Sequence, residues 1–514
     1  MKVSYKVDLG GNVRPYPHYW EMCVGSCHAT TILREDVREH IRAAHRDCGF
    51  KYLRFHGLFD DDMSVVIKPM MPWGKVEVSF LNIDSIFDFL LDTGMKPFVE
   101  IGFMPEALAS GTQTCMHYKG NVTPPADYDK WAELIRMFGE HLIERYGKEE
   151  VSQWFFEVWN EPNLNFFFSG TRDEYFKLYK TTAETLKAVS PCFRVGGPAT
   201  SVNAWIPPFR AFCEENNVPL DFISTHHYPS DDPLSTFGMN DGTAPAMKMP
   251  TPEELAALSK EELEKMAGGF FGRKTENPRD ILFQMTKKAK EEAGDYPLYY
   301  TEWNGADEYD TSYQAAFIAQ TIAYNEGMVE GYSFWTVSDI FEEMGLLPTP
   351  YKNAFGMQNN NGVPKPSYRM FQVLHEAGDM RLPVEGSHRT AEVFALTNGR
   401  HATVIAYNHD IERRDVETQE MELTLTGKKV CQVRKAVISD GHCDPKAAWK
   451  AMGSPMYLKK DEVTELMKAS ELCYESLPVS EGNQVLTFTA EPESVTIFDV
   501  EYEEIGRASC RERV

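Results

Sequence analysis

Two glutamates that each end an apolar run are the strongest candidates for chemistry in this chain. Glu161 follows the run 154–159 and precedes a proline, and Glu302 ends the run 297–302. Such runs are typical of buried strands in a parallel sheet, and the proline prevents further strand pairing. Side chains at the carboxyl ends of these strands form the active sites of α/β barrels, because strand ends are rigid and the following loops are open to ligand. From this motif alone, a glutamate that caps the next helix remains an alternative for Glu161.

Two carboxylates that face each other across a barrel mouth are what the cleavage of a glycosidic bond requires. One must be protonated to give a proton to the leaving oxygen, and the other must be ionised to attack the anomeric carbon. Asn160 precedes Glu161, and its amide could hold a sugar 2-hydroxyl. We therefore interpret Glu161 as the acid/base and Glu302 as the nucleophile. We expect the rings of Tyr300 and Trp303, which flank Glu302, to orient the nucleophile.

Arginine and histidine side chains end two other predicted strands. Arg54 and His56 share one face, and a buried Arg54 near Glu302 would keep that carboxylate ionised. A structural ion pair under the site is the alternative for Arg54. His226 and His227 are neighbours on a strand, so they point to opposite faces and cannot easily share a metal ion.

We therefore expect His226 and Tyr228 to face inward and to hydrogen-bond sugar hydroxyls, with His227 as a core histidine. Trp335 ends the last predicted strand and suits an apolar platform under a sugar ring. Glu342 and Glu343 follow in the next loop, where a charge pair more often belongs to a solvated surface than to a binding site.

The elements that position these residues alternate between apolar strands and amphipathic helices. Eight strand–helix pairs predict a (β/α)8 TIM barrel, of fold class α/β, over residues 15–378. A doubly wound open sheet is less favoured, because no Gly-x-Gly-x-x-Gly turn follows the first strand. The predicted strands are Met22–Cys27, Lys51–Phe59, Lys96–Met104, Gln153–Asn160, Arg194–Ala199, Phe222–Tyr228, Leu298–Trp303 and Gly331–Val337.

The pattern changes near residue 380 to short strands with alternating polarity. Residues 379–505 predict an additional antiparallel β-sandwich domain with a helical insert at 445–472, and residues 1–14 predict a strand that joins it. An insertion at 229–279, with a helix at 252–266, is expected to shape the substrate pocket. Residues 506–514 are expected to be a disordered tail.

Composition excludes several functional classes. The 514 residues carry a formal net charge of −25, which argues against nucleic acid or an anionic membrane as a partner. The N-terminus lacks the apolar segment of a signal peptide, and no segment resembles a membrane helix. The ten cysteines form no Cys-x-x-Cys pair, which predicts reduced thiols in a cytoplasmic protein and no structural metal.

Four stretches beyond the two glutamate motifs carry a resemblance to a known family. They are Cys23–Ala29, Arg54–Gly57, Ser224–Pro229 and Phe334–Glu343, and a fifth, Met452–Leu458, lies in the second domain. Together with the segments around Glu161 and Glu302, they resemble the β-D-xylosidases of glycoside hydrolase family 39. The resemblance spans nearly the whole chain except the tail. Trp303 and Cys27 depart from the family pattern, where many relatives carry Tyr and Gly.

The resemblance implies a retaining, exo-acting xylosidase without cofactor or metal, which releases xylose from the non-reducing end of short β-1,4-xylo-oligosaccharides and is often a homotetramer. It implies Glu161 as the acid/base and Glu302 as the nucleophile. It also implies substrate contacts, now including both loop glutamates, at His56, Asn160, His226, Tyr228, Trp335, Glu342 and Glu343. The same family includes α-L-iduronidases, but an iduronate carboxylate should meet a cation where this chain offers Glu342 and Glu343. A non-catalytic sugar-binding barrel would have lost one of the two carboxylates.

Overall fold

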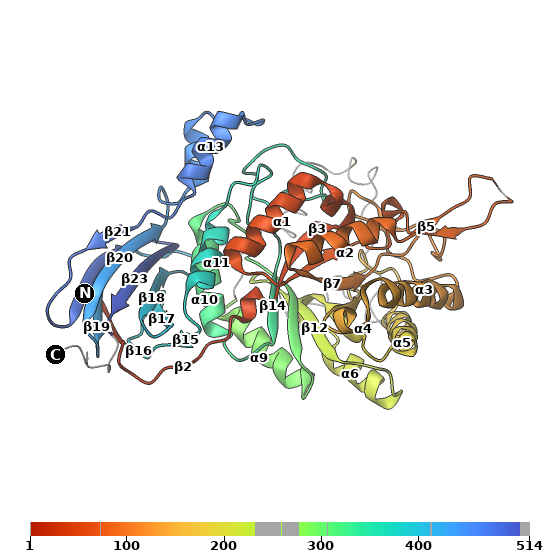
Figure 1. The fold of residues 1–514 in the computed structure, drawn as a ribbon, viewed down its shortest axis with the longest axis horizontal. Helices are drawn as coiled ribbons and strands as arrows, with labels where there is room; N and C mark the ends of the chain where they lie inside the picture. Colours follow the sequence, from red (N-terminus) through yellow and green to blue (C-terminus); the bar gives the residue numbers. More distant parts are fainter. Residues whose placement is uncertain are drawn as a thin grey trace, which may run out of the picture. The chain divides into compact units, whose positions relative to one another are not determined.

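The structure, a computed structural model, describes residues 2–71, 73–231, 257, 259, 277–305, 307–411 and 414–503 (Figure 1). The predicted helix at 252–266, most of the insertion at 229–279 and the predicted tail lie outside the described residues. None of the helices in the described part of the chain combines the length and apolar character of a membrane span.

Eight strands close into a barrel, which confirms the predicted fold. Their order around the barrel is β10, β11, β12, β13, β14, β3, β4 and β7. The pairings of β10 with β7 and β11, of β11 with β12, and of β14 with β3 are parallel. The strands are β3 (Cys23–His28), β4 (Tyr52–His56), β7 (Lys96–Ile101), β10 (Phe155–Val158), β11 (Arg194–Thr200), β12 (Phe222–His227), β13 (Leu298–Trp303) and β14 (Gly331–Phe334).

Several barrel strands end earlier than the apolar runs predict. β4 ends at His56 and β10 at Val158, because the next residues, Gly57 and Trp159, have φ of 70° and 73° and take the chain out of the extended conformation. The residues after Val158 therefore belong to a turn rather than to the strand.

Helices alternate with the barrel strands, as the sequence pattern predicts. They are α1 (Glu35–Cys48), α2 (Leu81–Thr93), α3 (Tyr128–Tyr146), α4 (Lys148–Val151), α5 (Arg172–Val189), α6 (Ile206–Glu215), α9 (Ile281–Ala293), α10 (Ser312–Tyr324) and α11 (Pro366–Glu376). Local sequence fixes their ends. Thr171 and Glu174 form a capping box at the start of α5, and Gly49, with φ of 75°, ends α1 in the left-handed conformation that favours glycine.

Residue contacts divide the chain into two compact units. One unit comprises residues 55–87 and 97–302, and the other comprises residues 1–54, 88–96 and 303–514. In the first unit, α3 packs against α5, and the indole of Trp131 donates a hydrogen bond to Thr182 at 2.9 Å. Two short hairpins, β5 (Val66–Ile67) with β6 (Glu77–Val78) and β8 (Thr114–Cys115) with β9 (Gly120–Asn121), belong to the same unit.

The second unit contains a β-sandwich in addition to its barrel strands. One sheet has the order β16 (Val384–Glu385), β1 (Val3–Asp8), β19 (Gln419–Thr426) and β22 (Gln484–Ala490). The other has the order β2 (Arg14–Pro15), β15 (Met380–Arg381), β17 (Ala391–Thr397), β18 (His401–Asn408), β23 (Ser494–Tyr502), β20 (Val430–Ile438) and β21 (Glu475–Leu477). The N-terminal strand β1 pairs with β19 in parallel, whereas the other sandwich pairings that the structure describes are antiparallel.

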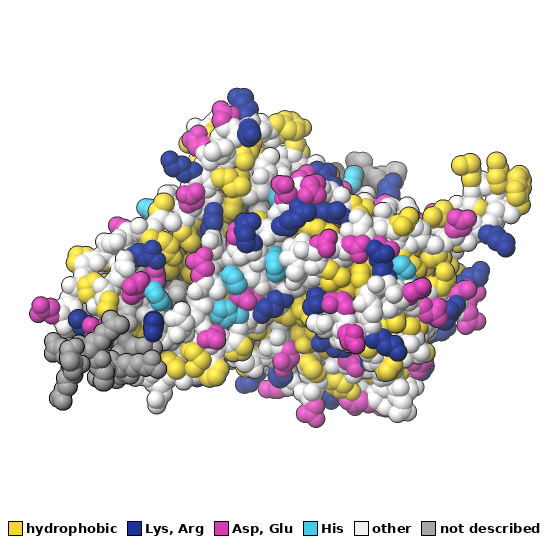
Figure 2. All heavy atoms as spheres, in the orientation of Figure 1, with side chains coloured by type: hydrophobic (Ala, Val, Ile, Leu, Met, Phe, Trp, Pro, Cys, Tyr) yellow, Lys and Arg dark blue, Asp and Glu magenta, His cyan; other side chains and the backbone are white. Residues whose placement is uncertain are grey.

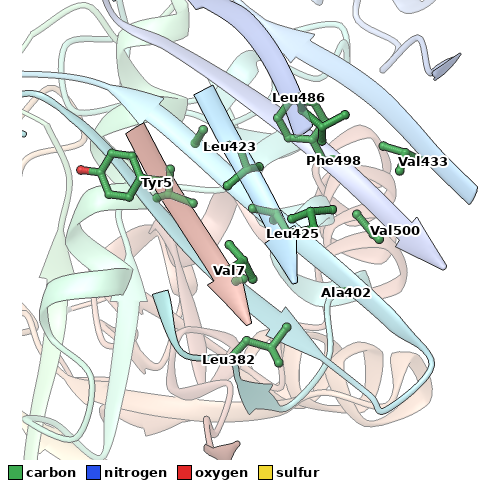
Figure 3. Close-up of a cluster of buried hydrophobic side chains, with 14 of the residues drawn as sticks. Tyr5, Val7, Leu382, Ala402, Leu423, Leu425, Val433, Leu486, Phe498 and Val500 are labelled. Atoms are coloured by element: carbon green, nitrogen blue, oxygen red, sulfur yellow. The ribbon is translucent and has the colours of Figure 1, made fainter. Parts of the chain in front are cut away.

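Alternating apolar side chains from both sheets form the sandwich core. Tyr5 and Val7 of β1, Leu423 of β19 and Phe498 and Val500 of β23 are buried in one cluster (Figure 3). Helix α10 packs against β18 and β23, and the hydroxyl of its Tyr324 donates a hydrogen bond to Glu392 at 2.7 Å. The sandwich therefore stabilises the helix that follows the strand of Glu302 and Trp303.

The predicted helical insert forms two helices, α12 (Pro445–Ala451) and α13 (Lys460–Ala469). Trp449 and Leu466 of these helices bury a small apolar cluster with Tyr351 and Val363. Lys446 lies 3.8 Å from the buried carboxylate of Asp310. The insert thus packs on the loops that precede α10 and α11.

Neighbouring residues of β22 provide a test of the sandwich core. Leu486 is 5% exposed within the cluster, whereas Val485 is 48% exposed on the opposite face. We expect Leu486→Ala to lower the free energy of unfolding of the sandwich by about 2–5 kcal/mol, because it removes buried methyl groups and leaves a cavity. Val485→Ala, the matched control, should change it by less than about 0.5 kcal/mol. Denaturant unfolding followed by fluorescence measures both, and equal losses would contradict the assigned strand register.

Candidate active site

Glu161 has a constrained position at the end of β10. Its backbone φ is 42°, and that of Trp159 is 73°, conformations that side-chain-bearing residues adopt at a cost. Hydrogen bonds fix both residues: Glu161 N–H donates to Ala199 O at 2.8 Å, and Trp159 N–H donates to Ile101 O at 3.0 Å. The carbonyl of Ala199 is free for this bond because the pairing of β11 with β12 is interrupted between Pro198 and Thr200.

The structure brings Glu161 and Glu302 together. They are 7% and 5% exposed, and one oxygen of each lies within 4.8 Å of the other and of a ring nitrogen of His226. The predicted convergence of two remote carboxyl groups is therefore present in the structure. The oxygens lie closer than the ~6.5–9.5 Å that separates the carboxyl groups of inverting glycosidases.

Each carboxyl group has different partners. His226 Nδ1 lies 3.0 Å from Glu161 Oε1 and 3.6 Å from Glu302 Oε2. The hydroxyl of Tyr228 donates a hydrogen bond to Glu302 Oε2 at 2.9 Å. His56 Nε2 lies 3.6 Å from Glu302 Oε1 on the other side of the carboxylate. His56, His226 and Tyr228 thus surround the carboxyl pair, as their places at strand ends predict.

The rings expected to orient Glu302 have other partners. Tyr300 donates its hydroxyl hydrogen to Asn203 Oδ1 at 2.8 Å and stacks on His227 with ring centroids 3.7 Å apart. Trp303 is buried against Tyr332 and Phe334. Tyr228, which follows the neighbouring strand β12, donates a hydrogen bond to Glu302.

His227 is the core histidine that strand alternation predicts. It is fully buried, and burial lowers its pKa well below the usual value of 6.5, an effect to which His226 adds. A neutral ring stacked on Tyr300 does not suit metal binding together with His226, which points to the opposite side of β12.

The remaining predicted residues are buried or nearly so. Asn160 is 1% exposed beside Glu161, and Arg54 is fully buried in β4. Trp335, 2% exposed, belongs to the other compact unit, where a Cβ on Gly25 would come within 2.3 Å of its ring. The glycine of β3 therefore makes room for the indole.

The loop after β14 contains Glu342 and Glu343, both partly exposed. Glu342 Oε2 lies 3.2 Å from His28 Nδ1, and its backbone N–H donates to the sulfur of Cys27 at 3.2 Å. The end of β3 therefore holds Glu342 in place, so this glutamate is not a freely solvated side chain. The family motif around Cys27 and His28 gains a structural role from these two contacts.

Three polar residues that the sequence did not single out lie one layer below the carboxyl pair. Glu100 Oε2 lies 2.7 Å from His56 Nδ1. The hydroxyl of Thr301 lies 3.1 Å from His226 Nε2 and donates to Glu157 Oε1 at 2.7 Å. The available signal was the presence of Glu100 and Glu157 inside otherwise apolar strands, where an unpaired carboxylate would be costly.

Two groups of described side chains that lie within a single compact unit have ligand atoms spaced for a cation. One is the trio of Glu161, His226 and Glu302. The other is His18, Glu21 and His375, in which both histidines lie within 2.8 Å of the same carboxylate oxygen. Lys51 lies 3.5 Å from Glu21 as well, and a neighbouring ammonium opposes cation binding there.

The carboxyl pair can perform acid–base and nucleophilic chemistry on one bound group. Like charges at this separation in a nearly buried site disfavour the doubly ionised state. One protonated and one ionised carboxyl is the combination that a retaining glycosidase needs.

Comparison with known proteins agrees with this chemistry. The profile of Glycosyl hydrolases family 39 matches residues 3–263 and 273–483. A β-xylosidase of Caldicellulosiruptor saccharolyticus is 45% identical over 482 residues, which cover 92% of each protein. A β-xylosidase of Geobacillus stearothermophilus is 33% identical over 505 residues, or 94% of this chain and 92% of that protein.

Solved structures agree as well. The structure of a GH39 β-xylosidase from Caulobacter crescentus superposes with a TM-score of 0.77 at 29% identity, covering 97% of this chain and 99% of that one. With a match along nearly the whole sequence and a barrel that brings two carboxyl groups together, this chain belongs to glycoside hydrolase family 39.

Proposed function

We propose that this protein is a retaining, exo-acting β-D-xylosidase that releases xylose from the non-reducing end of short β-1,4-xylo-oligosaccharides. The observation that carries the proposal is the close approach of the two carboxyl groups. One oxygen of Glu161 and one of Glu302 lie within 4.8 Å of each other and of a ring nitrogen of His226. The β-xylosidases that cover nearly the whole chain support xylose as the sugar.

In the proposed first step, Glu302 attacks the anomeric carbon while Glu161 gives a proton to the leaving oxygen. The hydrogen bond from Tyr228 and the nearby His56 ring orient the Glu302 carboxylate for this attack. In the second step, Glu161 takes a proton from water, and the water attacks the glycosyl ester on Glu302. Two inversions at the same carbon retain the β configuration.

A neutral pentose fits the remaining candidate contacts. We assign the 2-hydroxyl to Asn160 and further hydroxyl contacts to His56, His226 and Tyr228. Trp335 would provide an apolar platform and Glu342 and Glu343 would accept hydroxyl hydrogens, with Arg54 as a supporting residue. A carboxylate at the position of two glutamates would be repelled, which disfavours a uronate.

The protein is further proposed to be a cytoplasmic homo-oligomer, a homotetramer by its family likeness. The nine cysteines that the structure describes are free, in keeping with a reducing compartment. Hydrophobic side chains gather at the end of the β5–β6 hairpin, where Met70 is 95% and Trp73 is 81% exposed (Figure 2). Such exposed apolar groups are typical of protein–protein interfaces.

A panel of nitrophenyl glycosides tests the substrate and the stereochemistry together. We expect turnover of the β-D-xyloside, with the α-L-iduronide slower by about 10²-fold or more, because the latter places a charge beside acidic side chains. NMR of the first product should show β-xylose before mutarotation. α-Xylose as the first product would contradict retention, and no turnover of any glycoside would favour the non-catalytic barrel.

Substitution of Glu302 tests its role as the nucleophile. Glu302→Ala should lower kcat for aryl β-xylosides on the order of 10⁴-fold or more, because no glycosyl ester can form. Added azide should restore turnover and give the α-xylosyl azide, since it attacks the face that the carboxylate occupied. Recovery of a β-azide would assign the nucleophile to another residue.

Substitution of Glu161 tests its role as the acid/base. Glu161→Ala should slow formation of the glycosyl-enzyme about 10²–10⁴-fold for xylobiose, but little for a dinitrophenyl xyloside, whose leaving group needs no proton. A pre-steady-state burst of dinitrophenol measures the spared first step. Equal losses for the activated and unactivated substrates would show that Glu161 is not the proton donor.

A further inference from the structure

A line of hydrogen-bonding groups runs from Glu161 into the barrel interior. Glu161 Oε1 lies 3.0 Å from His226 Nδ1, and His226 Nε2 lies 3.1 Å from the hydroxyl of Thr301. That hydroxyl donates its hydrogen to Glu157 Oε1 at 2.7 Å. All four residues lie in the same compact unit, and His226, Thr301 and Glu157 are no more than 1% exposed.

The direction of the last hydrogen bond fixes the hydrogens of the others. A hydroxyl has one hydrogen, and Thr301 gives it to Glu157, so Thr301 can only accept from His226. His226 must then carry its hydrogen on Nε2. A neutral imidazole has a single N–H, so Nδ1, the atom nearest Glu161, presents a lone pair.

A lone pair beside Glu161 favours the protonated carboxyl over the carboxylate. At 3.0 Å, the Glu161–His226 contact needs one hydrogen between its two atoms, and with Nδ1 bare this hydrogen belongs to Glu161. The opposite tautomer would place an N–H against Glu161 and would stabilise its ionised form. The tautomer of His226 thus affects how well the acid keeps its proton. Two other acidic groups face this contact: Glu302 Oε2 lies 3.6 Å from the same Nδ1, and burial, together with the charge of Glu161, raises the pKa of Asp231.

We propose that Thr301 and Glu157 are positioning residues that hold His226 in the Nε2–H tautomer and so keep Glu161 protonated in the free enzyme. The inference rests on the proposed role of Glu161 as the acid. Neither residue touches the sugar, and both act through the His226 ring. When Glu161 has given its proton to the leaving oxygen, the same lone pair favours its reprotonation by the incoming water.

The pH dependence of kcat/KM tests the proposal, because its alkaline limb reports loss of the acid's proton. In Thr301→Val the imidazole is free to place its hydrogen on Nδ1 and to stabilise ionised Glu161. We expect the alkaline limb for xylobiose to move about one pH unit lower, the size of one hydrogen bond to a charged group. Thr301→Ser keeps the hydroxyl and should retain the wild-type limb.

A matched control separates this effect from loss of a barrel hydroxyl. Thr225 is fully buried in the neighbouring strand, and its hydroxyl donates to the backbone oxygen of Thr200 at 2.8 Å instead of to the site. Thr225→Val should leave the alkaline limb in place. In Thr301→Val, kcat/KM for the dinitrophenyl xyloside should change little, because the first step with this substrate needs no acid. A purely structural defect would instead lower kcat/KM for both substrates at every pH. An unchanged alkaline limb in Thr301→Val would overturn the proposal.

A direct measurement of the tautomer does not depend on activity. NMR of the wild-type protein with ¹⁵N-labelled histidine, with His226 assigned from the His226→Asn variant, should show hydrogen on Nε2 and a bare Nδ1. Hydrogen on Nδ1 at neutral pH would overturn the proposal even if the enzyme is a xylosidase. Conversely, an Nε2–H tautomer in a protein whose Glu161→Ala variant keeps full activity on xylobiose would leave the tautomer assignment correct and refute the role of Glu161.

Discussion

Two carboxyl groups that lie within 4.8 Å of each other, both nearly buried, cannot both be ionised without a large electrostatic cost, and this constraint governs the site. The structure resolves it by giving each carboxyl different partners. The Tyr228 hydroxyl donates to Glu302, whereas His226 Nδ1 lies nearer to Glu161, at 3.0 Å, than to Glu302, at 3.6 Å. In the proposed mechanism, the opposite protonation states that glycoside cleavage requires follow from which hydrogen-bonding group each carboxyl contacts, because the two residues are chemically identical.

Such a division of roles depends on backbone positions that hold to within a fraction of an ångström. Closed barrel strands provide most of this rigidity, but the immediate support of Glu161 is irregular. The left-handed backbone at Trp159 and Glu161 is costly, and the carbonyl of Ala199, exposed by the break in the pairing of β11 with β12, holds Glu161 in place. The strained turn persists because the strands around it are buried, so the packing of the barrel maintains the position of Glu161.

Periodicity predicted the elements better than their contacts. The apolar run before Glu302 gave β13 with its observed bounds, and strand alternation correctly separated His226 from His227. Alternation failed at the end of β13, where the neighbours Thr301 and Glu302 both approach the ring of His226. It also failed at the start of β20, where a register shift between Val430 and Gln432 breaks the polar–apolar pattern. Bulges and strand ends follow from tertiary packing, which a single sequence does not display.

Polar residues below the site have a different role from those at its rim. A buried carboxyl such as Glu157 adds little to stability, because an apolar side chain of similar volume could fill the same space without the cost of desolvation. A residue of this kind must instead contribute something that packing cannot. In this barrel its hydrogen bond gives the Thr301 hydroxyl a single direction, and through that direction it gives the His226 ring a single tautomer. On this proposal, residues deep in the barrel interior contribute to catalysis as well as to stability, because groups that no substrate reaches hold the proton of Glu161 in place.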